Sequence, residues 1–77
     1  MWEIIGFETQ ENDAGEVTAY TVHAVKAYRE GQGQGKRGKR IWYRASEQGY
    51  RPTVGEKVVI EVEVRGKYEV VTDIYPA

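Results

Sequence analysis

Residues 57–74, KVVIEVEVRGKYEVVTDI, carry the clearest structural pattern in the chain. Apolar and charged side chains alternate along each half of this stretch, which is typical of a strand with one buried face. Residues 65–67 supply a tight three-residue connection, because Gly66 can adopt the positive φ that such a turn needs. The sequence therefore predicts a β-hairpin in which Val64 lies opposite Tyr68. The side chains predicted to face the core are Val58, Ile60, Val62, Val64, Tyr68, Val70, Thr72 and Ile74.

The rest of the sequence predicts three further strands, at residues 2–9, 16–28 and 39–45. All three are rich in β-branched and aromatic residues, and glycine-containing turns separate them. No segment of helical length places apolar residues at a spacing of three to four. Between the third and fourth strands only residues 45–53 are available for a helix. Gly49 and Pro52 give this segment a low helical propensity.

Two of these strands carry signs of irregularity. Ile4 and Ile5 are adjacent, so both qualify for the buried face, and Gly6 suggests a bend. Along residues 16–28 the apolar positions switch parity, which predicts a bulge or a strong coil in that strand.

Five short strands in 77 residues predict an all-β fold. We expect one domain over residues 1–77: a small five-stranded, partly open barrel, OB-like or SH3-like, with a protruding basic hairpin arm. Because OB folds often carry a helix between the third and fourth strands, the weak helical signal favours a helix-less barrel. A chain this short has a small core, so a homodimer is also expected.

The third strand is expected to present an aromatic and cationic face to solvent. Ile41 and Tyr43 share one side of it, while Arg40, Trp42 and Arg44 share the other. Arginine is rarely buried without a partner, so the side that bears Trp42 is predicted to be the exposed one.

Residues 29–40, REGQGQGKRGKR, run directly into that strand. They contain five Lys or Arg residues, one glutamate and four glycines. We expect a flexible arm over residues 30–38, because nothing apolar offsets the entropy of ordering it. The glycines do not form a phosphate loop, since no helix follows them.

The net charge of −1 conceals a polar distribution along the chain. Residues 1–25 carry −5, residues 26–51 carry +6 and residues 52–77 carry −2. Such asymmetry predicts one basic and one acidic region on the surface.

Several functional classes are not expected. The chain has no cysteine, His23 is the single histidine, and Ser46 is the single serine, so we expect no catalytic centre, metal site or cofactor. The first residues lack the basic and apolar regions of a signal peptide, and no apolar run could span a bilayer. We therefore expect a cytoplasmic protein.

The plan of the chain resembles the small single-stranded-DNA-binding proteins of filamentous phages, and other short barrel proteins of phages and plasmids. The resemblance lies in the length, the all-strand pattern, the basic hairpin at residues 29–40 and the scattered tyrosines. Residues 52–58, PTVGEKV, also resemble the lead-in of barrel domains in which a glycine precedes a valine-rich strand. The resemblance implies a barrel that binds single-stranded DNA.

Two functional hypotheses follow. The first is sequence-tolerant binding of nucleic acid, single-stranded more than double-stranded, in which cations contact phosphates and aromatic rings stack on bases. The second is a protein-interaction or structural module without a nucleic-acid role. The candidate cations are Arg29, Lys36, Arg37, Lys39, Arg40 and Arg44, and the candidate aromatic residues are Trp42, Tyr28, Tyr43 and Tyr50.

Overall fold

The computed structural model describes all residues from Met1 to Ala77. Its strands form one antiparallel sheet of order β3-β2-β1-β4-β5. The sheet is not closed by hydrogen bonds, because β3 and β5 are its two edges. The fold is thus all-β and fits a partly open small barrel, as predicted. In chain order the elements are β1 (Trp2–Glu11), β2 (Val17–Ala27), β3 (Lys36–Arg44), α1 (Ala45–Gln48), β4 (Lys57–Arg65) and β5 (Tyr68–Pro76).

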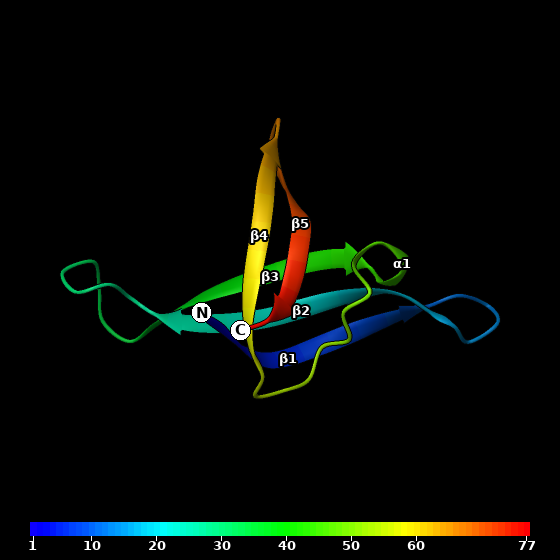
Figure 1. Ribbon diagram of the computed structural model, residues 1–77, viewed down its shortest axis with the longest axis horizontal. Helices are drawn as coiled ribbons and strands as arrows, with labels where there is room; N and C mark the ends of the chain where they lie inside the picture. Colours follow the sequence, from blue (N-terminus) through cyan, green and yellow to red (C-terminus); the bar gives the residue numbers. More distant parts are fainter.

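The molecule is elongated and flat, with extents of 48 × 31 × 18 Å. β1, β2 and β3 form a long meander, and the β4–β5 hairpin crosses their direction and projects beyond them (Figure 1). The predicted basic arm, residues 29–40, is divided in the structure: residues 28–35 form the loop at one end of this meander, and four of the five cations lie in β3. β3 begins at Lys36, three residues earlier than predicted, so residues 36–38 belong to the β-ladder. No helix has the length and apolar character needed to cross a membrane.

β1 is bent by a bulge that lets it pair with two different strands. Its pairing with β2 shifts register between Ile4 and Gly6, which leaves Ile5 as the extra residue. Ile4 is therefore fully buried while Ile5 points to solvent. Before the bulge, Trp2 and Glu3 pair with β4 as well. The predicted bend at Gly6 is confirmed.

β2 pairs regularly with β3 from Ala19 to Ala27, and its one irregularity is the shift against β1 near its start, at Thr18. The switch of apolar parity in the β2 sequence has a cause besides this shift at Thr18. Four consecutive residues, Ala19, Tyr20, Thr21 and Val22, are all buried, because both faces of the strand are covered there.

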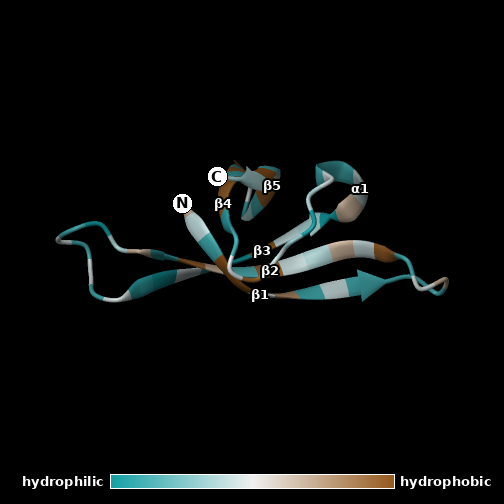
Figure 2. Ribbon diagram, turned by 60° about the horizontal axis from the view of Figure 1, so that its bottom comes forward, coloured by the Kyte–Doolittle hydropathy of each residue, from teal (hydrophilic) through white to brown (hydrophobic).

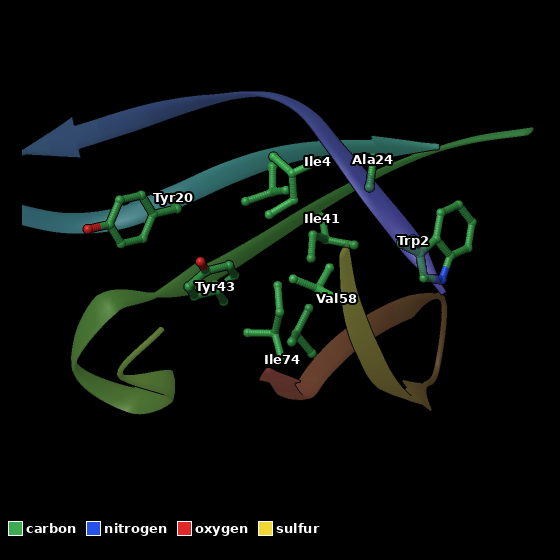
Figure 3. Close-up of a cluster of buried hydrophobic side chains, with 10 residues drawn as sticks. Trp2, Ile4, Tyr20, Ala24, Ile41, Tyr43, Val58 and Ile74 are labelled. Atoms are coloured by element: carbon green, nitrogen blue, oxygen red, sulfur yellow. The ribbon is translucent and has the colours of Figure 1, made fainter. Parts of the chain in front are cut away.

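The core lies between the inner face of the β1–β2–β3 meander and the β4–β5 hairpin (Figure 3). Ile4, Val22 and Val58 are its fully buried centre. Trp2 lies at one end of the cluster in Figure 3. The other members are Tyr20, Ala24, Ile41, Tyr43, Val71 and Ile74.

The hairpin at residues 57–74 exists, but its predicted register is wrong. Arg65 pairs with Tyr68 across a two-residue turn, in which Gly66 has a φ of 60°. Two-residue hairpin turns match the twist of the strands better than the three-residue connection that we predicted. A shift at Thr72 then restores the inward direction of Ile74. The predicted core members that are exposed instead are Val64, Tyr68, Val70 and Thr72.

Val71 takes the place of Val70 in the core, and this exchange follows from the shifted register. Between the turn and Thr72 each residue of β5 has moved to the opposite face, so Val62 pairs with Val71. Glu63 lies opposite Val70 rather than Glu69, so the like-charge pair implied by the predicted register does not form.

The preference for a helix-less barrel is also wrong. α1 is a single helical turn between β3 and β4. Gly49, which weakened the helical signal, ends this turn in the left-handed conformation and donates its N–H to the carbonyl of Ala45. The Gln48 side chain donates to the backbone carbonyl of Val71, 3.2 Å away, and so ties the turn to β5.

A tyrosine network joins the end of β3 to the segment that enters β4. The Tyr43 hydroxyl donates to the carbonyl of Tyr50 at 3.1 Å, and the Tyr50 hydroxyl donates to the Glu56 carboxylate. Burial raises the pKa of Tyr43 well above its ordinary value. Burial raises the pKa of Tyr50 as well, with a further contribution from Glu56.

We expect Val71→Ala to lower the free energy of unfolding by about 1–3 kcal/mol, because it removes buried methyl groups and leaves a cavity. Val70→Ala is the matched control and should cost less than half as much, since its side chain is partly exposed. Urea unfolding of the two variants measures both values. Equal losses, or a larger loss for Val70→Ala, would contradict the register described above.

We expect stability to fall as the pH rises above about 10, the pKa of tyrosine in an unfolded chain. There the unfolded state releases protons that Tyr43 and Tyr50 retain in the folded state, so the free energy of unfolding decreases with pH. Tyr50→Phe should reduce this slope, because one of the two groups is removed. Urea titrations from neutral pH to about pH 11 provide the measurement, and a flat profile for the parent chain would refute the expectation.

Candidate nucleic-acid interface

One face of the β1–β2–β3 meander has no secondary-structure element packed on it. Figure 2 shows the meander edge-on, with β4, β5 and α1 all on the opposite side. We call the uncovered side the outer face. Ile41 and Tyr43 are buried on the inner side of β3, whereas Trp42 is 47% exposed on the outer face. The predicted assignment of the two sides of β3 is therefore confirmed.

The Trp42 ring lies across the neighbouring strand β2. Its Nε1 donates to Oε1 of Gln10 at 3.1 Å, and Gln10 belongs to β1, two strands away. Strands that are two places apart are separated by about 10 Å, so the indole has to reach over β2 to make this bond. Beneath it lie two small residues, Ala19 and Thr21, which are only 2% and 7% exposed. Trp42 is thus a fixed aromatic surface on the outer face.

Cations flank this ring along β3. Arg40 and Arg44 lie two residues to either side of Trp42, which puts all three on the same face. Arg40 has no carboxylate oxygen within ion-pair distance, and the nearest to Arg44 is Glu47, at 3.7 Å. The Arg40 guanidinium group is therefore free of an internal ion pair, whereas that of Arg44 is paired with Glu47 at the surface. His23 of β2 lies opposite Arg40, and its Nε2 is 3.5 Å from Oε1 of Glu8.

The structure does not gather all the predicted cations into one patch. By alternation, Lys36 joins Arg40 and Arg44 on the outer face, while Arg37 and Lys39 point to the inner side. Lys39 contacts Glu69 of β5 at 3.0 Å, across the opening between the two sheet edges. Arg29 lies in the loop of residues 28–35, just after the end of β2.

The three predicted tyrosines are also dispersed. Tyr43 is a core residue, so its ring is not presented to a ligand. Tyr50 is half-buried against the core and holds Glu56. Tyr28 alone is exposed on the arm, where its ring lies against Gly33 so closely that a Cβ there would approach it to 3.2 Å. Alternation alone could have excluded Tyr43, because it shares a side with Ile41.

A groove of about 440 Å³ begins beside the ring of Trp42. Thr21 and Arg40 line it on the side of the outer face, and Val70 and Val71 line it on the side of β5. Its volume lies in the range of small-molecule sites, so it has room for a planar group beside the indole.

One group of acidic side chains lies away from the outer face. Glu61, Glu63 and Asp73 are exposed on the projecting β4–β5 hairpin. Glu61 accepts a hydrogen bond from Tyr75 and, as the nearest negative charge, raises the pKa of that tyrosine. The acidic side chains of residues 1–25 are not all kept apart from this face, because Glu8 of β1 lies on it, opposite Thr21 of β2.

Gln10 and Thr21 belong to the site, although neither was a candidate from the sequence. Gln10 bonds the indole and Thr21 lies beneath it, and these roles depend on strand pairing that local composition does not encode. No group of three or more His, Cys, Asp or Glu side chains is arranged to hold a metal ion. In comparisons with known proteins, no family model, no curated protein and no solved structure matches this chain.

Proposed function

We propose that this protein binds single-stranded nucleic acid on the outer face of β2 and β3, without strong sequence preference. The observation that carries the proposal is the Trp42 ring, fixed over β2 by Gln10 and flanked by Arg40 and Arg44. Stacking of a base on an exposed indole and contacts of phosphates with guanidinium groups are the two interactions that such proteins combine.

The geometry favours an unpaired strand over a duplex. In a duplex the faces of the bases are covered by their neighbours, so a flat aromatic surface finds no base to stack on. Because every base has a π-face, stacking on Trp42 would tolerate any sequence. Lys36 and Arg29 continue the cationic track from β3 into the arm.

The strand order also supports the proposal. β1 pairs with both β2 and β4, and α1 lies between β3 and β4, as in an OB-like rather than an SH3-like barrel. OB folds commonly bind oligonucleotides on the face formed by their second and third strands, which is the face that carries Trp42 here. The resemblance to phage proteins that bind single-stranded DNA points in the same direction.

A second candidate function is a protein contact through the tip of the β4–β5 hairpin. Val64 and Tyr68 are 69% and 75% exposed there, one on each face of the hairpin. This surface lies on a different part of the molecule from Trp42, so a protein partner could use it without covering the outer face.

We expect Trp42→Ala to remain folded, because Trp42 is not among the residues of the inner core. Its affinity for a single-stranded oligonucleotide should fall by about 1–3 kcal/mol through the loss of stacking. Tyr68→Ala is the matched control, since it removes an exposed aromatic ring from the hairpin tip. Fluorescence anisotropy of a labelled oligonucleotide at low salt gives the affinities, and thermal unfolding checks the fold.

Two results would refute the proposal. One is a parent chain that binds no oligonucleotide at low salt, which would leave the protein-contact function as the better account. The other is equal affinity of the parent and Trp42→Ala, which would remove the indole from the binding surface.

We expect the triple variant Lys36→Gln, Arg40→Gln, Arg44→Gln to bind more weakly and with a flatter salt dependence. Each lost phosphate contact should reduce the slope of log affinity against log salt by about 0.7. The control changes three exposed cations outside β3 in the same way: Arg51, Arg65 and Lys67. A slope that changes equally in both triple variants would mean that overall charge, and not this face, governs binding.

A further inference from the structure

Three cations gather around one indole ring on the inner side of the arm. Nζ of Lys26 lies 4.7 Å from the centroid of the Trp2 ring, Cζ of Arg37 lies 5.5 Å from it, and Nζ of Lys39 lies 5.8 Å from it. Trp2 itself is 8% exposed and belongs to the core. We call this group the Trp2 cluster. It faces away from Trp42, because Arg37 and Lys39 point to the inner side of β3.

The positive charge of the Trp2 cluster is not neutralised within the chain. Lys26 and Arg37 are direct cross-strand partners, an arrangement that is unfavourable for like charges. Lys39 is the only one of the three with an ion pair, to Glu69 at 3.0 Å. The negative face of the indole attracts cations and so explains why they gather, but it carries no net charge to balance them.

The cations of the Trp2 cluster carry the donors that a phosphate requires. Arg37 supplies a guanidinium group, whose fork of N–H donors matches phosphate oxygens. Lys26, its cross-strand partner, supplies an ammonium group beside it.

We propose that the Trp2 cluster is a phosphate-binding site, separate from the outer face. β3 is an edge strand, so a polynucleotide held at Trp42 can pass round the arm and place a phosphate against Lys26 and Arg37. That the phosphate belongs to a polynucleotide rests on the function proposed above. The site would also accept a free polyphosphate, which has the same chemistry.

The two tryptophans of the chain allow the two sites to be observed separately. In Trp42→Phe, the single remaining indole is Trp2, which lies within the proposed site. Its emission is followed during titration with inorganic tripolyphosphate and, in a second series, with an oligo(dT) strand at low salt. We expect both ligands to change it.

Charge variants then identify the groups that bind. In the Trp42→Phe background, Lys26→Gln and Arg37→Gln should each weaken tripolyphosphate binding about tenfold, as expected for loss of one charged hydrogen bond. Arg37→Lys keeps the charge and should bind more tightly than Arg37→Gln. Lys67→Gln is the control, because it removes one exposed cation from the β4–β5 turn. Thermal unfolding verifies that each variant is folded.

The outcomes separate this proposal from the proposed function. No response of Trp2 to either ligand, or equal weakening by Lys67→Gln and Lys26→Gln, overturns the phosphate site. The proposed function stands without the phosphate site if Trp2→Phe still binds the oligonucleotide in the anisotropy assay. If Trp2→Phe does not fold, the parent chain is used for this measurement. A response to tripolyphosphate alone supports the site and assigns it to free phosphates rather than to a polynucleotide.

Discussion

The bend in β1 is the constraint on which the rest of the architecture depends. Ile5 is an extra residue in β1, so the strand changes direction there. The part of β1 before Ile5 pairs with β4, and the β4–β5 hairpin therefore crosses the meander instead of extending it (Figure 1). Ile4, immediately before the bulge, is then fully buried between the two layers, together with Val22 and Val58. Without this bend the hairpin would continue the meander as one twisted sheet and would not fold back over its inner face.

The crossing also decides which surfaces remain free. The hairpin covers only the inner side of the meander, so the outer side has to be covered by its own side chains. Trp42 does this for Ala19 and Thr21. On the inner side, the three cations of the Trp2 cluster cover an indole at the end of the core. In both places a structural need for cover brings an aromatic ring and cations together. The surfaces that we propose for ligands therefore arise from the small size of the core.

The sequence predicts much of the fold, because alternation reports on local burial. Five strands, the two sides of β3 and the bend near Ile5 all follow from neighbouring residues. What it misses depends on distant partners. The register of the β4–β5 hairpin is set by a two-residue turn and a bulge at Thr72, and alternation fits either of two registers equally well when valines are adjacent. α1 is stabilised by Gly49 and by a bond from Gln48 to β5, so local composition underestimates it.

The candidate site is predicted in the same uneven way. Trp42, Arg40 and Arg44 come from one strand, and their common face is readable from their spacing. Gln10 and Lys26 come from other strands, and only the pairing of β2 with its neighbours brings them to the two indoles. The basic stretch of the sequence appears continuous, yet a strand sends successive residues to opposite sides and so divides it into two groups.

The open edges of the barrel give the Lys39–Glu69 ion pair a wider significance. An unpaired strand edge can add a strand from another chain, which is the usual route to edge-to-edge aggregation. Here both edge strands carry charges. The β3 edge has Lys36, Arg37, Lys39 and Arg40, and the β5 edge has Glu69, Asp73 and, at its end, Pro76. These charges and the proline, which has no N–H to donate, oppose strand addition at both edges. The Lys39–Glu69 ion pair joins the two edges where no backbone hydrogen bonds close the barrel.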